Sequence, residues 1–230
     1  DLNIKRMKIQ VIEMQDELLK SMSDNASKKA LSYLKELGVD VMLNKSVASF
    51  DGDKLTFKSG EELESKTLIW AAGVRGNVIN GFPETSIDRG MYVVDRTSKV
   101  KGFENIYAVG DIAYMTTPLF ESGLPQVAPV ANQQGTFLAK NLVRVRNNEK
   151  PLEFEYNDQG SMATIGRNRA VVDMGKIKFQ GTLAWFVWMF IHLISLVGFR
   201  NRVITFFNWS YNYFSFDRGA RLIIRKFQRN

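Results

Sequence analysis

The chain has 230 residues, 45% of them hydrophobic and 24% charged, a composition that excludes a largely disordered protein. It contains no cysteine, which excludes thiolate nucleophiles, dithiol redox pairs and cysteine metal sites, and its one histidine, His192, leaves little for a metal centre or a serine triad. The net charge of +7 is concentrated in residues 151–230, where 11 Lys and Arg stand against 5 Asp and Glu beside three of the four tryptophans, which favours anionic lipid or nucleic acid as a partner.

The first forty residues predict a strand, a helix and a second strand. Residues 8–13 are typical of a buried strand that ends in an acid, Glu13. Residues 24–37 have the pattern of a helix that Gly38 stops, and residues 39–43 predict the next strand. Because strand and helix alternate, this part indicates a doubly wound α/β sheet, in which ligands bind at the carboxyl ends of the strands.

The next segment predicts a β-meander and one more strand. Residues 47–64 form three short alternating runs with turns at Asp51-Gly52 and near Ser59-Gly60. Residues 67–71 are apolar, and we expect them to form a buried strand that leads directly into Ala72 and Gly73.

Beyond a loop at residues 76–83, the chain predicts further short elements. Residues 91–94 and 105–109 have the pattern of strands, the second of which ends in Gly110-Asp111. We expect a helix to begin near Pro125, at its favoured first-turn position, and to run to residue 147. A hairpin is predicted from residues 162–164 and 170–172.

A glycine-rich phosphate-binding turn is missing from this pattern. A dinucleotide-binding unit begins with a strand, a Gly-rich turn and a helix, yet none of the 17 glycines forms a Gly-x-Gly pair. The chain opens at what should be the second strand of such a unit. We therefore expect the turn that holds the diphosphate to lie upstream of residue 1.

Several strand ends and one helix start carry candidate ligand-binding residues. Glu13 can accept the ribose hydroxyls of an adenosine, which would select NADH over NADPH, or it can cap the next turn. Small side chains let a backbone approach a flat ligand closely, although they are also common at ordinary turns; they are Ala71, Ala72 and Gly73.

The Gly-Asp pair and the start of the following helix are the more specific candidates for ligand binding. A strand that ends in Gly110-Asp111 points a carboxylate beyond the sheet, toward a ribityl hydroxyl or as the cap of a turn. Residues 129–135 place amides near a helix start, where backbone N–H groups stabilise negative charge and a glutamine can hydrogen-bond a quinone carbonyl. A solvated polar helix face is the alternative.

The last fifty residues are aromatic, basic and almost free of acids. Residues 183–199 are apolar, at the short limit for a bilayer span, and we expect a buried or membrane-edge helix rather than a transmembrane one. A later basic face opposite an apolar one predicts an in-plane membrane anchor, with a water-exposed or RNA-bound face as the alternative; its arginines are Arg218, Arg221, Arg225 and Arg229. No groove-reading motif supports nucleic acid.

Five segments together resemble the C-terminal half of the type II NADH dehydrogenases, the single-subunit NADH:quinone oxidoreductases of the two-dinucleotide-domain flavoproteins. The segments are IQVIEMQDELL, TLIWAAGV, FENIYAVGDIA, APVANQQGTFLAKNL and GTLAWFVWMFIHLISLVGFRNR. TLIWAAGV and the Gly-Asp motif are shared with many relatives, whereas the tryptophan-rich last segment is specific to the NADH:quinone enzymes.

The resemblance implies a role for each candidate residue. Glu13 would meet the NADH ribose, and Ala71, Ala72 and Gly73 would line the NADH cleft. Gly110 and Asp111 would hold the ribityl-phosphate region of FAD. Beside the isoalloxazine, at the quinone mouth, would lie Ala131, Gln133 and Gln134. Pro129 stands where many members have the first glutamine of the Ala-Gln-x-Ala-x-Gln run, which affects its quinone contact.

The implied fold is an incomplete two-dinucleotide-binding-domain (Rossmann-like) flavoprotein fold with a β-meander and a C-terminal helical membrane-anchoring region. Residues 1–75 would complete the NADH domain and residues 76–175 the FAD domain. Residues 176–230 would anchor the protein, and the anchoring residues include Trp185, Trp188, Trp209, Arg218, Arg221 and Arg225.

The family activity is NADH:quinone oxidoreduction without proton pumping, at the cytoplasmic face of the inner membrane, with FAD as cofactor. The expected partners are NADH, a membrane quinone and an anionic lipid surface, and homo-oligomers are expected because a cut sheet exposes strand edges. We expect this chain alone to bind neither FAD nor NADH tightly. The alternatives are a non-catalytic membrane-association module and a thiol-free ferredoxin or rubredoxin reductase.

Overall fold

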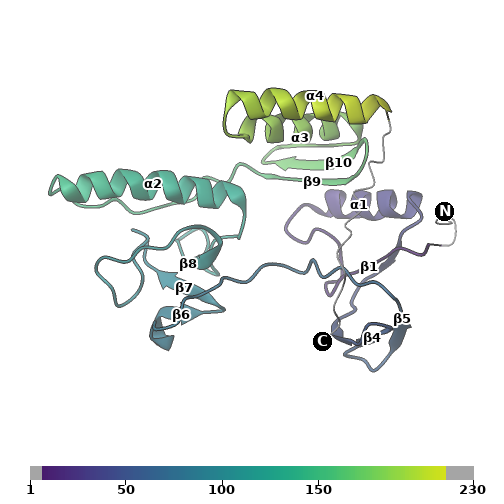
Figure 1. Cartoon of the computed structure of the whole chain (residues 1–230), viewed down its shortest axis with the longest axis horizontal. Coiled ribbons are helices and arrows are strands. Elements are labelled where there is room, and N and C mark those ends of the chain that lie inside the picture. The colour runs from purple at the N-terminus through teal and green to yellow at the C-terminus, as the bar shows by residue number, and fades with distance from the viewer. Residues whose placement is uncertain (1–6, 216–230) are drawn as a thin grey trace, which may run out of the picture. The chain divides into compact units, whose positions relative to one another are not determined.

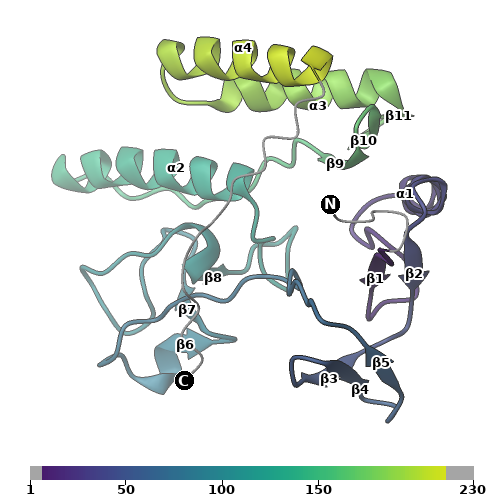
Figure 2. The same ribbon diagram turned by 45° about the vertical axis from the view of Figure 1, so that its right-hand side comes forward.

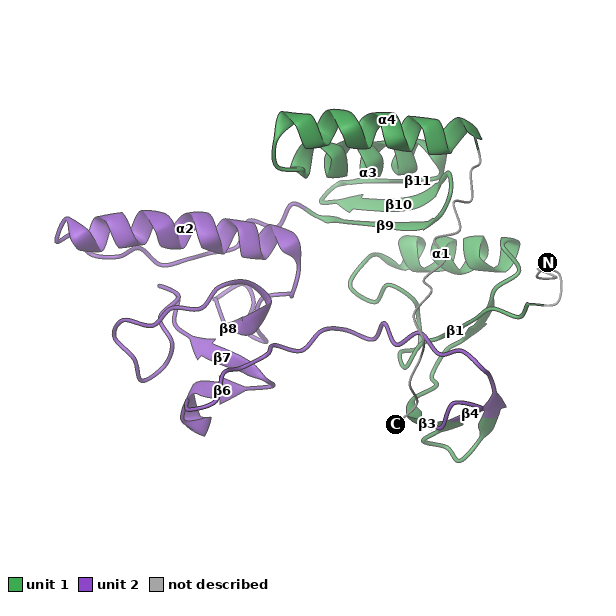
Figure 3. Cartoon of the chain, in the orientation of Figure 1, with its two compact units in different colours: residues 1–49, 56–62, 160–230 green, residues 50–55, 63–159 purple. Residues whose placement is uncertain are grey.

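A computed structural model describes residues 7–215 of the chain, which form two compact units (Figure 3). Of the described residues, the first unit contains those up to Ser49, Thr56–Glu62 and those from Gly160 onward. The second contains Phe50–Leu55 and Leu63–Gln159. The division into an NADH part, an FAD part and an anchor remains a prediction.

The first unit opens with the predicted strand, helix and strand. Strands β1 (Gln10–Ile12) and β2 (Asp40–Met42) pair in parallel, joined by helix α1 (Asp24–Glu36). The helix ends where Gly38 adopts a left-handed φ of 77° and its N–H bonds the Lys35 carbonyl, as is usual for a glycine at a helix end. These three elements confirm the prediction.

The last part of the first unit is stacked in layers (Figures 1 and 2). Strands β9 (Ser161–Gly166), β10 (Arg169–Met174) and β11 (Ile177–Gln180) form an antiparallel sheet with β10 in the centre. Helix α1 packs on one face and α3 (Thr182–Ser195) on the other, and α4 (Phe199–Ser215) packs on α3. The centre of β10 is therefore buried on both faces, at Ala170, Val171 and Val172. The hairpin was predicted; β11 and α4 were not.

Strand β10 also contacts both ends of α1. The Asp173 carboxylate accepts the Ser23 backbone N–H at 2.6 Å and the Ser23 hydroxyl at 3.0 Å, just before α1 begins. At the other end of the helix, Arg169 Nε lies 3.5 Å from Glu36 Oε2. An anion at the N-terminus and a cation near the C-terminus both interact favourably with the helix dipole, so β10 fixes α1 electrostatically as well as by packing.

Strands β3 (Val47–Phe50), β4 (Lys54–Phe57) and β5 (Glu62–Glu64) form the predicted meander. The strand predicted at residues 67–71 is wrong. These residues form no strand in the structure, and Ile69 and Trp70 are 84% and 65% exposed. The reason is the lack of a partner: within residues 7–215, β1 and β2 pair only with each other, and an extended run without a neighbouring strand leaves its backbone unpaired.

The second unit is built on a sheet of order β6-β7-β8: β6 (Ile87–Asp88), β7 (Met91–Val94) and β8 (Ala113–Met115). A 3-10 turn, η2 (Glu84–Ser86), precedes β6, and another, η3 (Gly110–Ile112), precedes β8. The strand predicted at residues 105–109 is wrong. Only the bridge between Lys99 and Tyr107 forms there, because β8 takes the edge of β7.

Helix α2 (Ala128–Arg146) completes this unit and confirms that a helix forms here, but it begins at Ala128 and not near Pro125 as predicted. Pro129, rather than Pro125, takes the favoured position in the first turn. Its Val130 enters a core shared with β7, β8 and the segment near Phe154. Tyr92, Met115 and Tyr156 are further members of this core. The core fixes α2 beside the turn that carries Gly110 and Asp111.

Candidate functional site

The Gly110–Asp111 turn lies against the first two turns of α2. Gly110 has a φ of 74°, and a β-carbon at this position would lie 3.2 Å from the Ala131 β-carbon, so glycine and alanine together permit the close approach. The Gly110 N–H donates to Gln134 Oε1 at 2.7 Å, and Gln126 Nε2 donates to the Asp111 carbonyl at 2.8 Å. Two glutamines therefore hold the turn from its two sides.

This arrangement leaves the Asp111 side chain available. Asp111 is exposed, and within the described part of the chain its carboxylate has no hydrogen-bond or ion-pair partner. The start of α2 is also open, because its N-cap residue, Val127, offers no side-chain cap. A free carboxylate accepts ligand hydroxyls, and an uncapped helix start favours negative charge.

The two adjacent glutamines of α2 are used differently from what the sequence predicted. Gln133 Nε2 donates to the Asn157 carbonyl at 3.0 Å, and its Oε1 accepts the Asn157 N–H at 3.1 Å, so both ends of its amide bond the backbone of a neighbouring segment. Gln134 is 0% exposed and its Nε2 lies 3.8 Å from Met115 Sδ. A quinone carbonyl, which only accepts, could bond Gln133 only through Nε2, which has a second hydrogen beside the one donated to Asn157.

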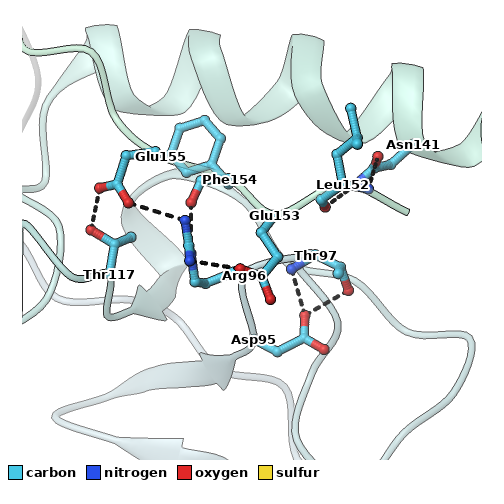
Figure 4. A network of polar contacts seen from close by, with 9 residues as sticks. All are labelled: Asp95, Arg96, Thr97, Thr117, Asn141, Leu152, Glu153, Phe154 and Glu155. Atoms are coloured by element: carbon cyan, nitrogen blue, oxygen red, sulfur yellow. Dashed lines mark hydrogen bonds and ion pairs between the residues drawn. The ribbon is translucent and has the colours of Figure 1, made fainter. Parts of the chain in front are cut away.

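The segment that contains Asn157 is held by a polar network that the sequence did not reveal (Figure 4). Arg96 contacts Glu153 at 2.7 Å, Glu155 at 3.0 Å and the Phe154 carbonyl at 3.0 Å. Thr117 donates to Glu155 at 2.6 Å. One arginine thus ties the extended segment to the loop after β7, because its planar guanidinium can serve several acceptors at once.

The predicted NADH residues lie apart from this turn along the chain. Glu13 follows β1, and its Oε1 accepts the Gln15 N–H at 2.8 Å, so the structure shows the turn-capping role that the sequence left open. Ala71, Ala72 and Gly73 are exposed, and Gly73 has a φ of 86°. Their contact with a ligand remains a prediction.

The tryptophans predicted for the membrane form ring contacts between α3 and α4, and their contact with a membrane stays a prediction. Trp188 stacks with Trp209 at 6.4 Å between ring centroids, and Trp185 lies 5.6 Å from Tyr213. The exposed apolar side chains are others. One set on α3 comprises Leu183, Phe186, Phe190 and Ile194, and one set on α4 comprises Ile204, Phe207, Tyr211 and Phe214. Phe199 and Phe206 of α4 are also exposed but lie outside these sets. Steps of three and four residues place each set on one helix face, a signal that was readable in the sequence.

The remaining predicted anchor residues, Arg218, Arg221 and Arg225, lie outside the described residues. None of the helices within residues 7–215 has the length and apolar character needed to cross a membrane. In the same range, no three His, Asp or Glu side chains are placed to hold a metal ion.

Comparison with known proteins places this geometry in a family. Residues 2–135 match the pyridine nucleotide-disulphide oxidoreductases, and residues 159–218 match the NDH2 C-terminal domain. The chain therefore belongs to the pyridine nucleotide-disulphide oxidoreductase family, which confirms an α/β, Rossmann-like flavoprotein fold.

Within that family, the relatives are type II NADH:quinone oxidoreductases, which confirms the resemblance seen in the sequence. The Mycobacterium tuberculosis enzyme NdhA is 36% identical over 222 residues, 90% of this chain and 46% of the relative. The Staphylococcus aureus enzyme is 32% identical over 175 residues, 72% of this chain and 42% of the relative. The chain spans about half the length of these curated relatives.

A solved structure agrees in fold. NDH2 from Plasmodium falciparum in complex with NADH superposes with a TM-score of 0.80 at 19% identity, covering 90% of this chain and 58% of that one. This match shows that the chain shares the fold of that NDH2 structure.

Proposed function

We propose that the chain is the C-terminal portion of an FAD-dependent NADH:quinone oxidoreductase that does not pump protons and that works at a membrane surface. Its relatives in Mycobacterium tuberculosis and Staphylococcus aureus are named as such enzymes. The observation that carries the proposal is the free Asp111 carboxylate on a turn held against the uncapped start of α2.

The residues at this turn fit a flavin nucleotide. A β-carbon on Gly110 would fill the space next to Ala131, so the cradle requires the glycine that is present. Asp111 would accept hydroxyls of the ribityl chain, and the start of α2 would stabilise negative charge on the flavin. Bound FAD would supply the redox chemistry, taking hydride from NADH and passing electrons to the quinone, while the chain supplies placement and electrostatics.

NADH recognition would rest on the end of β1 and on residues 71–73. One Glu13 oxygen accepts the Gln15 N–H at 2.8 Å, which orients the carboxylate at the carboxyl end of a parallel strand. Adenosine ribose binds at such strand ends in dinucleotide folds, and a carboxylate there disfavours a 2′-phosphate. Ala71, Ala72 and Gly73, which belong to the second unit, would let NADH approach their backbone because their side chains are small.

The quinone would be reached near the start of α2, where Pro129 and Gln133 lie. Pro129 has no side-chain donor, so it cannot hydrogen-bond a quinone carbonyl. The Gln133 amide is bonded to Asn157 at 3.0 and 3.1 Å. We propose that Gln133 Nε2 donates its second hydrogen to the quinone carbonyl while the two bonds to Asn157 orient the amide.

Attachment to a membrane surface is supported by the exposed apolar faces of α3 and α4. Val197, in the connection between the helices, and Phe199, the first residue of α4, are 86% and 81% exposed. Arg200 and Arg202 follow in the first turn of α4, where a cation opposes the helix dipole unless an anionic group lies nearby. Anionic lipid headgroups would satisfy that requirement, which supports attachment to a membrane surface. The membrane surface that we propose is the cytoplasmic face of the inner membrane.

Vesicle sedimentation tests this attachment. Phe190→Ser and Phe207→Ser should each weaken binding to vesicles of phosphatidylcholine and phosphatidylglycerol, and added salt should weaken it further. Leu119→Ser, at an exposed leucine of the second unit, is the matched control and should bind as the unmodified protein does. Equal binding by all variants would contradict attachment through α3 and α4.

Electron-acceptor assays separate the catalytic alternatives. The complete polypeptide that carries this chain should contain flavin and reduce a short-chain quinone with NADH. Vesicle binding without this activity would favour a non-catalytic membrane module, and preferential reduction of ferredoxin or rubredoxin would favour the thiol-free reductase.

Sedimentation velocity tests whether the protein forms a homo-oligomer, and a single monomeric species would contradict that proposal.

A further inference from the structure

Gln134 is a buried amide for which the proposed chemistry gives no direct contact with a ligand. It is 0% exposed, so it cannot serve as a surface donor to quinone. Its Oε1 accepts the Gly110 N–H at 2.7 Å, and its Nε2 donates to Met115 Sδ at 3.8 Å. Burial of a side-chain amide is unfavourable unless hydrogen bonds to its partners offset the loss of its hydration.

The bond to Gly110 fixes a backbone conformation that has little other support. Gly110 has a φ of 74°, in a turn of only three residues, η3. The side chain of Gln134 reaches its amide from inside the molecule, and Gln126 reaches the Asp111 carbonyl from outside. With both ends held, the Asp111 Cα is fixed although its carboxylate contacts no other described residue.

We propose that Gln134 is a positioning residue for flavin binding. Together with Gln126 it holds the Gly110–Asp111 turn, so that the Asp111 carboxylate is already oriented when the ribityl hydroxyls of the flavin bind. This inference rests on the proposed function. Preorganisation of this kind improves affinity because the turn is ordered before the ligand arrives. The two neighbouring glutamines of α2 therefore have different roles: Gln133 bonds the segment that contains Asn157, and Gln134 holds the Gly110–Asp111 turn.

The test uses the complete polypeptide that carries this chain, with FAD affinity measured by fluorescence titration of the apoprotein. Gln134→Leu removes the acceptor and should weaken FAD binding about 10- to 100-fold, because the Gly110 N–H loses its buried partner. Gln134→Glu keeps an acceptor oxygen at the same distance along the side chain and should recover part of the affinity. Gln126→Ala, on the exposed side, should weaken binding about 3- to 10-fold.

Asn141→Leu is the matched control. Asn141 is also a buried amide of α2, 3% exposed, and it bonds the Leu152 backbone at 2.9 Å, away from the turn. It should lower thermal stability while leaving FAD affinity unchanged. Hydrogen exchange of the Gly110 amide gives a second readout, and Gln134→Leu should accelerate it where Asn141→Leu does not.

Two outcomes would overturn the inference. One is unchanged FAD affinity in both Gln134→Leu and Gln126→Ala with unchanged exchange at Gly110 in Gln134→Leu; the other is equal loss of affinity in Gln134→Leu and Asn141→Leu. Either could occur in a protein that still reduces quinone, so the proposed function would stand. Conversely, the expected affinity changes in a protein that does not reduce quinone would support the positioning role and contradict the proposed function.

Discussion

Removal of the Asp173 carboxylate should destabilise the start of α1. Asp173 accepts both the Ser23 N–H at 2.6 Å and the Ser23 hydroxyl at 3.0 Å, and Ser23, the N-cap residue, makes no side-chain cap of its own. The carboxylate of a distant strand therefore takes the place of a local cap. A lost N-cap costs about 0.5–2 kcal/mol, and a lost charge at a helix N-terminus about 0.3–1 kcal/mol.

We expect Asp173→Ala to lower the free energy of unfolding of the first unit by about 1.5–2.5 kcal/mol, since the two effects overlap. Urea unfolding followed by circular dichroism measures the total. Hydrogen exchange in residues 24–27 localises the loss, because the first turn of α1 should open more readily while β9 and β11 should not.

Two variants separate the charge from the hydrogen bonds. Asp173→Asn keeps an acceptor for the Ser23 N–H and should lose only about 0.3–1 kcal/mol. Ser23→Ala removes the hydroxyl bond alone, and its double mutant with Asp173→Ala should show a coupling energy of about 0.5–1 kcal/mol. A loss below about 0.5 kcal/mol for Asp173→Ala, or strict additivity of the pair, would refute the capping role.

Three further predictions follow from single groups. The backbone N–H groups of Asp53 and Lys54 donate to the Asp51 carboxylate and lower its pKa, so the stability that Asp51 gives to the meander is present above its unfolded-state pKa and is lost as pH falls through its folded-state pKa. Asp51→Asn should therefore reduce the change that acid causes in the NMR chemical shifts of this turn. Burial raises the pKa of the Tyr156 phenol, so the stability that its neutral form gives to the fold is complete below the unfolded-state pKa and is lost as pH rises through the folded-state pKa. Tyr156→Phe should therefore keep the protein folded to a higher pH in alkaline unfolding curves. Gly110→Ala should cost about 1–2 kcal/mol in denaturant unfolding, because alanine disfavours a φ of 74°, and no loss would contradict the observed turn.

Local patterns predicted the elements that depend on local physics. The helix at residues 24–36 ends at Gly38 because glycine adopts a positive φ at low cost, and the same property gives the turn after Asp51. Both signals lie within a few residues of the feature that they determine. Their prediction required no knowledge of the rest of the fold.

Strands depend on a partner, and there the sequence was insufficient. Residues 67–71 are as apolar as a buried strand, yet hydrophobicity does not say whether a neighbouring strand exists, and none pairs with them among residues 7–215. Residues 105–109 are extended, but β8 pairs with β7 in their place. Pairing is a tertiary property, so periodicity alone does not determine it.

The candidate site divides in the same way. The Gly110–Asp111 pair could be found in the sequence as a local motif, although the strand that was expected to end there does not form. Its supports could not, because Gln126 and Gln134 lie 15 and 24 residues from their partners and are ordinary in a helix start. The contacts between the tryptophans of α3 and α4 could not be predicted, because composition shows how aromatic a segment is and not which face each ring occupies; their role at a membrane stays a prediction.

The proposal that this chain completes a flavin-dependent NADH:quinone oxidoreductase is tested most directly by anaerobic rapid mixing of the complete polypeptide. Addition of NADH should bleach the visible absorbance of a stoichiometric bound flavin, and a subsequent quinone should restore it, both within one turnover. A preparation without flavin, or a flavin that NADH bleaches but quinone does not reoxidise, would contradict the account.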